Sequence, residues 1–291
     1  MMDQYPPILI GVDGGGTGCR VVVGTAQDGI LAEAKGGRAN VSTNFDEAIA
    51  HILEATRTAL NDAGQDAEQM NHAVAHLGLA GFTGPDIGKR VTDALPFGKS
   101  VVTEDTTTTI VGAIGPADGF VLALGTGTII ARQRGGVQTC IGGWCYQVSD
   151  QASGAWLGHG VLEQTLLVVD GIVPASALTD RLLEKLGGAA GIVQFSLKAR
   201  PGDFGTLAPD VVEMAAAGDP IGRMLMQRGA DYLQSALGAL EYQTNDILCL
   251  SGGVGPHYAG YLPDQMTANL VPAKGRAVDG AFALAKSAAA K

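Results

Sequence analysis

The hydrophobic pattern at the start of the chain predicts three strands. Residues 8–12 form a short apolar run that is typical of a buried strand, and a triple glycine follows at residues 14–16. Residues 20–25 resume as a valine-rich run, and an Asp-Gly pair then signals a hairpin into residues 30–34. We therefore expect an antiparallel meander in which a glycine turn joins the first two strands.

The same order of elements recurs in the second part of the chain. Residues 120–124 form an apolar run, residues 125–128 a glycine-rich turn and residues 129–132 a second strand, with a hairpin signal at residues 134–137. This repeat predicts two similar α/β halves. Ligands of open α/β sheets bind beyond the carboxyl ends of strands, which is where both glycine turns lie.

The boundary between the halves is expected at residues 112–119, and no low-complexity linker marks it. We assign residues 1–112 with the closing helix 276–291 to one domain, and residues 113–275 to the other. The other expected elements are helices at 45–62 and 86–95, strands at 73–79 and 100–103, helices at 154–169, 175–186, 206–216 and 220–242, a strand at 247–250 and a helix at 277–289.

The composition is that of a chain with a large core and an unusual amount of glycine. Apolar residues are 46% of the chain and charged residues 16%. Glycine, at 43 of 291 residues, is about twice as frequent as the roughly 7% of an average protein. It follows no three-residue period, which excludes collagen. Glycine inside apolar runs instead indicates tight turns and close backbone approaches.

The net charge of −10 argues against nucleic acid and anionic membranes as partners. No run of cations is present, and the densest basic pairs, Lys89-Arg90 and Arg132/Arg134, are expected on solvated faces. An anionic small ligand therefore needs backbone N–H groups or a metal ion.

The cysteines and the start of the chain indicate a cytoplasmic protein. Cys19, Cys140, Cys145 and Cys249 form no C-x-x-C pair, and no neighbouring cluster completes a zinc site. We expect four reduced thiols. The first residues lack a basic segment followed by a long apolar stretch, and no apolar run of about 18 residues marks a membrane span.

The first glycine turn has the chemistry of a phosphate cradle but matches neither of two well-known motifs. Gly11 and Gly16 have the P-loop spacing, but Thr17 stands where a lysine is required. The dinucleotide fingerprint fails because its last glycine is replaced by Cys19. Glycine and threonine still offer N–H and hydroxyl groups to phosphate. Asp13, at the strand end, is suited to hold Mg²⁺ through water.

Three segments resemble those that bind nucleotide in the sugar kinase/Hsp70/actin superfamily. Residues 10–17 (Ile-Gly-Val-Asp-Gly-Gly-Gly-Thr) resemble the first phosphate segment, residues 124–128 the second and residues 250–254 the adenosine segment. Plain hairpin turns are the alternative. They are disfavoured because two of the turns occupy equivalent places in a repeat and a third glycine turn follows.

Three further groups resemble the BadF/BadG/BcrA/BcrD ATPase family, in particular its N-acetylglucosamine and glucosamine kinases. They lie at residues 37–40, 103–105 and 142–158. The resemblance spans nearly the whole chain. It implies an α/β fold of two duplicated ribonuclease H-like, actin-like ATPase domains that flank a cleft for ATP and a sugar.

The resemblance also implies an activity, the ATP-dependent phosphorylation of the 6-hydroxyl of N-acetylglucosamine or glucosamine. Asp105 matches the aspartate that accepts the hydroxyl proton, and phosphoryl transfer needs one such carboxylate besides positioning and charge neutralisation. The alternative for Asp105 is a helix N-cap. The implied contacts to ATP and Mg²⁺ are Asp13, Gly14, Gly15, Gly16, Thr17, Gly125, Thr126, Gly127, Gly252 and Gly253, with Asp13 as the magnesium residue.

The implied sugar contacts are Asn40, Asp105, Gly143, Trp144 and Asp150. Asn40 could equally be a turn residue, and the ring of Trp144 faces either the sugar or the core. The eukaryotic kinases of the family read Gly-Asp-Glu-Gly-Ser where residues 149–153 read Ser-Asp-Gln-Ala-Ser. The loss of a carboxylate leaves the choice of sugar open.

Two other functions compete with a sugar kinase. One is an ATPase that activates a partner redox enzyme, but such activators hold an iron–sulfur cluster with cysteines, and the cluster spacing is absent here. The other is a non-catalytic sensor of nucleotide and sugar, against which the presence of Asp105 argues. A homodimer is expected because dimers are the commonest assembly.

Overall fold

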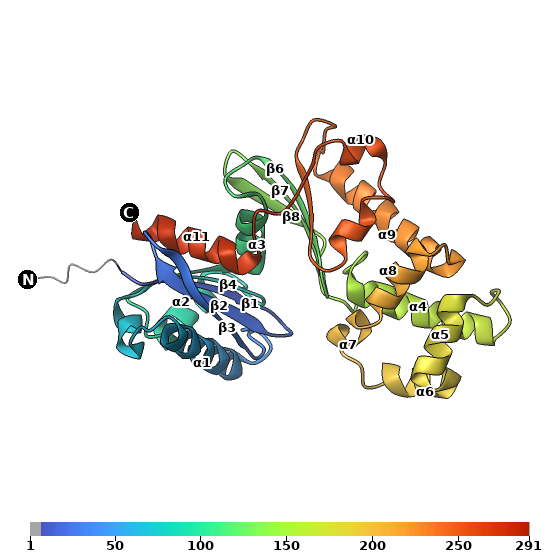
Figure 1. Ribbon diagram of the computed structural model, residues 1–291, viewed down its shortest axis with the longest axis horizontal. Helices are drawn as coiled ribbons and strands as arrows, with labels where there is room; N and C mark the ends of the chain where they lie inside the picture. The colour runs from blue at the N-terminus through green and yellow to red at the C-terminus, as the bar shows by residue number, and fades with distance from the viewer. Residues whose placement is uncertain (1–6, 291) are drawn as a thin grey trace, which may run out of the picture. The chain divides into compact units, whose positions relative to one another are not determined.

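The residues described, 7–290 of a computed structural model, form two units with the same strand topology (Figure 1). The first unit contains the chain up to Ala117 and its return from Ala273, and the second is Asp118–Pro272. Within these residues each unit holds a five-stranded sheet, in the orders β3-β2-β1-β4-β5 and β10-β9-β6-β7-β8. Both sheets combine two antiparallel strands on one side of the central strand with two parallel strands on the other. The predicted duplicated α/β fold is thus confirmed.

The first sheet is built around β1 (Leu9–Gly14), whose apolar run is almost completely buried. It pairs antiparallel with β2 (Cys19–Thr25), which in turn pairs antiparallel with β3 (Gly29–Gly36). On its other side β1 pairs in parallel with β4 (Val74–Leu79), which pairs in parallel with β5 (Lys99–Glu104). The predicted meander is confirmed. Because β1, β4 and β5 run in parallel, their carboxyl ends lie at one edge.

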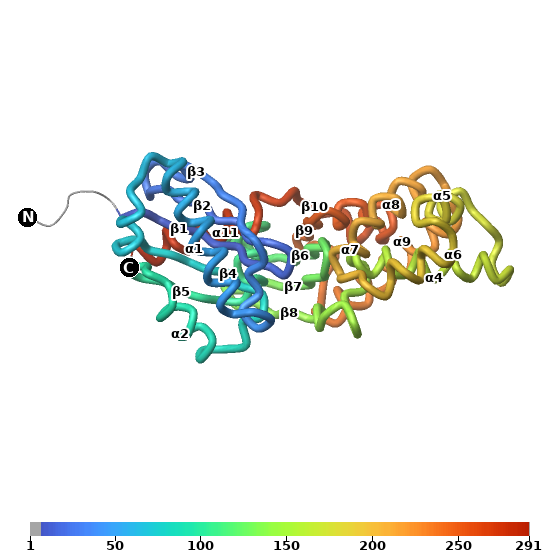
Figure 2. The backbone as a smooth tube through the Cα atoms, turned by 90° about the horizontal axis from the view of Figure 1, so that it is seen from below, coloured from blue at the N-terminus to red at the C-terminus, as the bar shows by residue number. Residues whose placement is uncertain are grey.

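Helices cover both faces of the first sheet. On one face α1 (Phe45–Asp62) packs against β2 and β3, and the side chain of Asn44 accepts from the N–H of Glu47 as its cap. On the other face α11 (Ala277–Ala289) packs on β1 and β4 beside α3 (Asp105–Ile114) (Figures 1 and 2). The remaining helices of this unit are α2 (Pro85–Ala94) and the 3₁₀ helix η1 (Ala67–His72).

Two glycines let α11 lie directly against its neighbours. A Cβ atom at Gly11 of β1 would stand 2.6 Å from the backbone nitrogen of Phe282, and one at Gly280 would overlap the carbonyl oxygen of Thr108 in α3. A larger residue at either position would force the backbones apart. Part of the glycine excess therefore serves backbone packing rather than turns.

The second sheet repeats the first. β6 (Gly119–Leu124) pairs antiparallel with β7 (Thr128–Arg134), which pairs with β8 (Val137–Ile141). On its other side β6 pairs in parallel with β9 (Leu248–Ser251), which pairs with the short β10 (Leu270–Val271). The glycine turn between β6 and β7 thus occupies the place that the first glycine turn has between β1 and β2.

The helices of the second unit share one large apolar core with this sheet. The helix expected at 206–216 begins only at residue 208, because a separate short helix ends at Gly205. The helix expected at 220–242 ends at Ala239, and Glu241 adopts a left-handed φ of 62° beyond it. The helices are α4 (Gly154–Val169), α5 (Ala177–Leu186), α6 (Gly188–Ser196), α7 (Pro201–Gly205), α8 (Ala208–Ala216), α9 (Pro220–Ala239), η2 (Gly255–Tyr258) and α10 (Asp264–Thr267).

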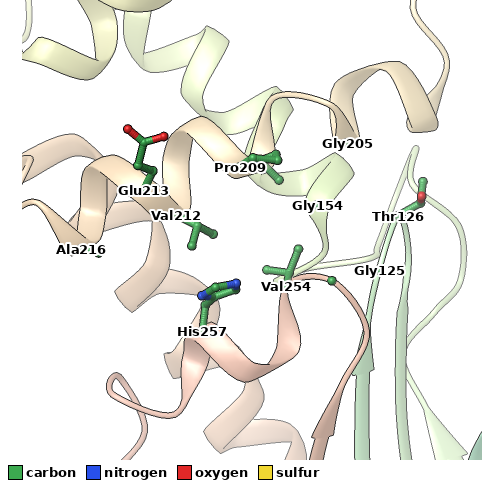
Figure 3. Close-up of a pocket in the computed structure, with 12 residues that line it drawn as sticks. Gly125, Thr126, Gly154, Gly205, Pro209, Val212, Glu213, Ala216, Val254 and His257 are labelled. Carbon is green, nitrogen blue, oxygen red and sulfur yellow. The ribbon is translucent and has the colours of Figure 1, made fainter. Parts of the chain in front are cut away.

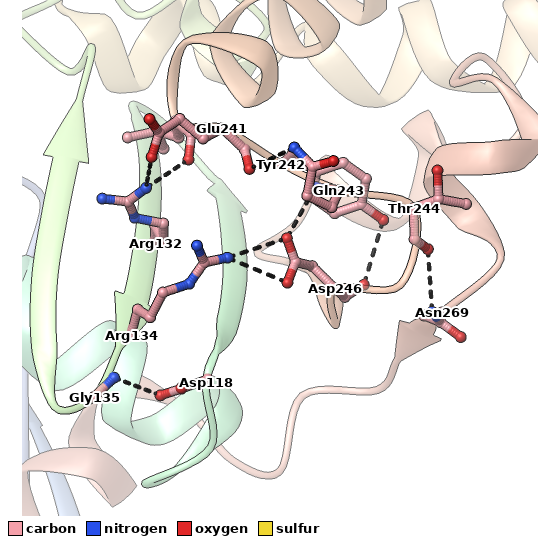
Figure 4. A network of polar contacts seen from close by, with 11 residues as sticks. Asp118, Arg132, Arg134, Gly135, Glu241, Tyr242, Gln243, Thr244, Asp246 and Asn269 are labelled. Carbon is pink, nitrogen blue, oxygen red and sulfur yellow. Dashed lines mark hydrogen bonds and ion pairs between the residues drawn. The ribbon is translucent and has the colours of Figure 1, made fainter.

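The expected solvated face is confirmed for Arg134, whose side chain is 49% exposed, but not for Arg132, which is only 21% exposed (Figure 4). Nη1 of Arg132 donates to the carbonyl oxygen of Leu240 at 3.0 Å and to the carboxylate of Glu241 at 2.7 Å. Nη2 of Arg134 donates to both carboxylate oxygens of Asp246 at 3.3 Å. These contacts tie β7 to the connection between α9 and β9. Elsewhere, none of the helices within residues 7–290 is long and apolar enough to span a lipid bilayer.

Candidate functional site

Asp13 lies next to the end of β1, at the edge where the parallel strands of the first sheet end. Its side chain is 21% exposed, and Oδ2 lies 3.7 Å from Nη1 of Arg20. Burial raises the pKa of Asp13, while the charges of Arg20 and Arg276 act in the opposite direction. A carboxylate held here supplies the hard oxygen ligand that Mg²⁺ prefers.

The first glycine turn has a packed part and an open part. Gly14 is buried, and the N–H of Gly15 donates to the carbonyl oxygen of Gly18 at 2.9 Å. Gly16 and Thr17 are exposed, and nothing lies within 4 Å of the Cβ position of Gly16. The open part can therefore offer N–H groups and a hydroxyl to an anion.

Asp105 follows β5 directly, at the same edge of the sheet as Asp13. Its pKa is raised to about 6, mainly by burial and also by the negative charges of Asp13 and Glu104. The alternative role as a helix cap is wrong, because α3 begins at Asp105 and its N-cap is Glu104. A mostly buried carboxylate whose pKa approaches neutrality is suited to accept a proton.

A buried histidine supports the strand end that carries Asp105. Nε2 of His76 on β4 lies 3.1 Å from Oγ1 of Thr103, and this hydroxyl donates to the carbonyl oxygen of Glu104 at 3.1 Å. Because the hydroxyl proton is used in that bond, Nε2 of His76 is the donor to Thr103. Burial lowers the pKa of His76 to about 4, so the ring is neutral at physiological pH.

Asn40 lies in the loop after β3, and the oxygen and the NH₂ group of its carboxamide have different roles. Its carboxamide oxygen accepts from the N–H of Ser42 at 3.0 Å, the hydroxyl of Ser42 at 2.8 Å and the N–H of Thr43 at 3.1 Å. The expected turn role is therefore real. It also fixes the orientation of the side chain and leaves the NH₂ group as the part available to a ligand.

In the second unit, the glycine turn after β6 is anchored to the start of α4. The N–H of Gly125 donates to the carbonyl oxygen of Gly127 at 3.0 Å. The first amides of the helix, those of Gly154 and Ala155, donate to the carbonyl oxygens of Gly125 and Thr126 at 2.8 and 3.3 Å. The carbonyl groups of the turn thus point at the helix.

The third glycine turn, after β9, packs on the end of β6. Gly252 has a left-handed φ of 80°, and a Cβ atom there would overlap the backbone of Leu124. The N–H of Val254 donates to the carbonyl oxygen of Leu124 at 2.9 Å. Gly253, by contrast, has open space above it. The turn therefore requires Gly252 for packing, and Gly253 faces the surface that a ligand can reach.

A cavity of about 610 Å³ within the second unit connects these two turns with α8 (Figure 3). Gly125 and Thr126 lie at one end, and Ala216 and His257 lie at the other. Apart from Thr126, Glu213 and His257, its lining residues carry no polar side-chain atoms; the lining consists of Gly125, Thr126, Gly154, Gly205, Ala208, Pro209, Val212, Glu213, Ala216, Gly253, Val254 and His257. Small ligands bind in such apolar concave sites with a few polar groups.

Asp150 lies against the second glycine turn, in a loop of unusual backbone. A Cβ atom at Gly127 would be 3.1 Å from the carboxylate of Asp150, whose pKa is raised by burial. Asp150 and Ala152 have left-handed φ angles of 62° and 67°, and Cys145 one of 98°. Non-glycine residues in this region carry strain that is typical of ligand-binding segments. Burial raises the pKa of Tyr232, and the charge of Asp150 adds to this effect.

Trp144 and Gly143 belong to the same loop. Trp144 is 77% exposed, so the alternative that its ring fills the core is wrong. Gly143 has a left-handed φ of 67°, and a Cβ atom there would stand 2.7 Å from the carbonyl oxygen of Thr128. The sequence therefore needs glycine at this position, and the indole ring next to it is free to meet a ligand.

Carboxylates are the groups that suit a metal ion here. Among residues 7–290 no three or more His, Cys, Asp or Glu side chains gather to hold a metal by themselves. Asp13 and Asp105 nevertheless present oxygen ligands at one sheet edge. This set fits Mg²⁺, which keeps several water ligands and binds one or two carboxylates together with substrate phosphates.

A comparison with known families accounts for nearly all of the chain. Residues 10–270 match the model of the BadF/BadG/BcrA/BcrD ATPase family. The chain belongs to this family. The family assignment predicted from the glycine turns and the loop segments is therefore confirmed.

Relatives of this ATPase family member extend over its whole length. Glucosamine kinase GspK of Vibrio cholerae serotype O1 is 29% identical over 278 residues, which cover 95% of each protein. The structure of a candidate N-acetylglucosamine kinase from Chromobacterium violaceum is 32% identical, with a TM-score of 0.89, over 96% of this chain and 99% of that one. A ROK family glucokinase from Streptomyces griseus, in complex with glucose and AMPPNP, has a TM-score of 0.61 at 17% identity, over 96% and 98%. The last similarity shows a shared fold, the actin-like ATPase fold.

Sequence reasoning missed His76, Tyr232 and the walls of the cavity. The signal for His76 was a lone polar residue in the apolar run at residues 73–79, which is fully buried as β4. Val212 and Ala216 gave no signal, because apolar residues at helical spacing look the same whether they face a core or a cavity.

Proposed function

We propose that the protein transfers the γ-phosphoryl group of ATP to the 6-hydroxyl of an amino sugar, glucosamine or N-acetylglucosamine. The observation that carries the proposal is Asp105, a partly buried carboxylate directly after β5 with a pKa raised to about 6. Family membership and the names of the full-length relatives support ATP as the donor and an amino sugar as the acceptor.

In this proposal the acceptor hydroxyl gives its proton to the carboxylate of Asp105 as its oxygen attacks the γ-phosphorus. The bond from that phosphorus to the β–γ bridging oxygen breaks, and ADP leaves with the electron pair. Mg²⁺ neutralises charge on the phosphates when bound, and Asp13 orients it through water. The neutral His76 holds Thr103 and Glu104, and so keeps the start of α3 in place for Asp105.

The donor binds through backbone rather than through cations. We assign the adenosine to the cavity of the second unit, with Gly252 and Gly253 at its edge, and the phosphates to Gly125, Thr126 and Gly127. The turn formed by Gly14, Gly15, Gly16 and Thr17 supplies further N–H groups and a hydroxyl. A chain with a net charge of −10 can hold ATP in this way, because amide dipoles and a metal replace a basic surface.

The acceptor contacts are assigned to side chains that are fixed before binding. Asn40 presents its NH₂ group, Asp150 a half-buried carboxylate and Trp144 an exposed ring beside Gly143. Sugar recognition needs such preset donors and acceptors. Each of these polar side chains can form a hydrogen bond to a sugar hydroxyl group.

A coupled ADP-release assay with Mg-ATP and a panel of hexoses tests the function. We expect ADP release that depends on glucosamine or N-acetylglucosamine and exceeds the release with no sugar by at least about 100-fold. Release of ADP that is equal with and without every sugar would instead favour an activator ATPase. No ADP release at all would favour a nucleotide and sugar sensor.

A further inference from the structure

The cavity of the second unit offers very little to distinguish one purine base from another. Its far end, away from Gly125 and Thr126, is formed by Val212 and Ala216 of α8 and by His257 of η2 (Figure 3). The aliphatic side chains provide area and shape but no hydrogen bonds. Val212 lies inside α8, where its N–H and C=O groups serve the hydrogen bonds of the helix, and the N–H of His257 donates to the carbonyl oxygen of Val254 at 3.1 Å.

Glu213 is the one acidic residue of the cavity lining, and it is engaged elsewhere. Its Oε1 accepts from Nη2 of Arg181 on α5 at 3.1 Å. Figure 3 shows its carboxylate pointing away from His257 and Val212. Pro209, at the start of α8, has no N–H group to offer. The imidazole of His257 therefore stands alone as a polar side chain at the far end.

A single imidazole can match either purine. In its neutral form the ring presents one N–H donor and one acceptor nitrogen, and either nitrogen can carry the proton. Adenine offers an amino donor beside an acceptor nitrogen, whereas guanine offers a carbonyl acceptor beside an N–H donor. One ring nitrogen of His257 can therefore accept from the amino group of adenine or, in the other tautomer, donate to the carbonyl oxygen of guanine, which gives either base one hydrogen bond.

We propose that the donor site accepts purine nucleoside triphosphates as a class, GTP and ITP as well as ATP, and selects them by shape. This inference rests on the proposed use of the cavity for the nucleoside of the phosphoryl donor. Sites built to hydrogen-bond a ligand reject an analogue that lacks the group by about 10⁴-fold or more, whereas apolar pockets discriminate far less. Pyrimidines bury less apolar area and should bind roughly tenfold more weakly.

The test measures both binding and turnover with the same four nucleotides. Affinities for non-hydrolysable analogues of ATP, GTP, ITP and CTP are determined by calorimetry with Mg²⁺, and sugar phosphate is measured directly with each parent nucleotide. We expect the three purines to agree within about tenfold in affinity and in kcat/KM, with CTP weaker. A preference for ATP over GTP above about 1000-fold, or equal binding of CTP, would overturn the inference.

The two measurements separate this inference from the proposed function. If the purine nucleotides bind equally and no sugar is phosphorylated, selection of purines by shape is supported and the proposed kinase activity is contradicted. If a sugar is phosphorylated rapidly with ATP but not with GTP or ITP, the kinase activity is supported and selection of purines by shape is contradicted.

Three variants test the individual residues. His257→Ala should weaken ATP and GTP analogues by the same factor, several-fold, while His72→Ala, at an exposed histidine of the first unit, should change neither. Glu213→Gln should leave the ratio of ATP to GTP affinity unchanged. A selective loss of ATP affinity in either His257→Ala or Glu213→Gln would show that the side chain reads adenine, and would contradict selection by shape.

Discussion

The two units share one topology but provide different chemistry at equivalent places. The next-to-last residue of β1 is the carboxylate Asp13, whereas the next-to-last residue of β6 is Ala123. In the first unit a second carboxylate, Asp105, follows β5. Burial raises the pKa of both Asp13 and Asp105, so that ionisation of either group is less favourable than in water. The corresponding edge of the second unit leads into an apolar cavity.

One fold can therefore contribute two different sites to a single reaction. A buried pair of acids is unfavourable for stability, and such groups occur where a proton or a metal must be handled. A cavity lined by glycine and aliphatic residues binds a nucleoside without reacting with it. We infer that the first unit supplies the base that activates the acceptor and that the second unit holds the nucleoside of the donor, and the following changes test that division.

The largest effect is expected from Asp105→Asn. Without a carboxylate to accept the hydroxyl proton, kcat should fall by about 10³-fold or more, while the affinity for ATP stays nearly intact. Steady-state kinetics and calorimetry measure the two quantities. Asp86→Asn is the matched control, because Asp86 lies in the first turn of α2 but is exposed.

The stability of the same variant gives an independent check. Because the pKa of Asp105 is raised from 3.8 to about 6, ionisation of this group destabilises the folded state, and its protonation as pH falls through about 6 relieves that cost. Asp105→Asn removes the buried charge, so its melting temperature at pH 7.5 should be no lower than that of the wild type. A clearly lower value would mean that the activity loss reflects damage to the fold.

The next largest effect is expected from filling the cavity of the second unit. Val212→Trp should raise KM for ATP by about 10- to 100-fold and leave KM for the sugar unchanged. Val193→Trp, at a 44% exposed position of α6, is the control for adding an indole ring. An equal rise of both KM values would show that donor and acceptor sites are not divided as we infer.

The pH dependence of turnover reports on the first unit alone. Asp105 accepts a proton only when it is ionised, so kcat/KM should fall about tenfold for each pH unit below a pKa of about 6. Glu104→Gln removes one of the negative charges that raise this pKa, and should move the acid limb to lower pH. Val212→Trp should leave it in place. If the pH at which kcat/KM falls is the same in Glu104→Gln and the wild type, Asp105 is not the base.

The smallest effect is expected at His76, which is linked to Asp105 indirectly: it contacts Thr103, and Thr103 bonds the carbonyl oxygen of Glu104. His76→Leu should lower kcat several-fold with little change in either KM, since it removes the donor to Thr103. His76→Gln keeps an N–H group near Nε2 and should recover most of the loss. Equal kcat values in the two variants would mean that His76 only fills space in the core.

Periodicity predicted the meander that opens each sheet, because its strands are short apolar runs next to glycine turns, but it missed the two-residue strand β10. It failed where helices follow one another, since nothing in the local pattern shows that a separate short helix ends at Gly205 before α8 begins at Ala208. The acids of the site were found because Asp13 and Asp105 lie beside recognisable segments. Arg132 was misjudged because its partners, Leu240 and Glu241, are more than 100 residues away.

The fate of the γ-phosphoryl group decides whether the protein is an amino-sugar kinase, and ³¹P NMR of the reaction mixture follows it directly. With Mg-ATP and glucosamine or N-acetylglucosamine, we predict a sugar phosphate with the phosphorus bonded to the 6-oxygen, formed by the wild type and almost absent with Asp105→Asn. Inorganic phosphate as the only product would contradict phosphoryl transfer to a sugar. Sugar phosphate formed at the wild-type rate by Asp105→Asn would contradict the role of Asp105 as the base.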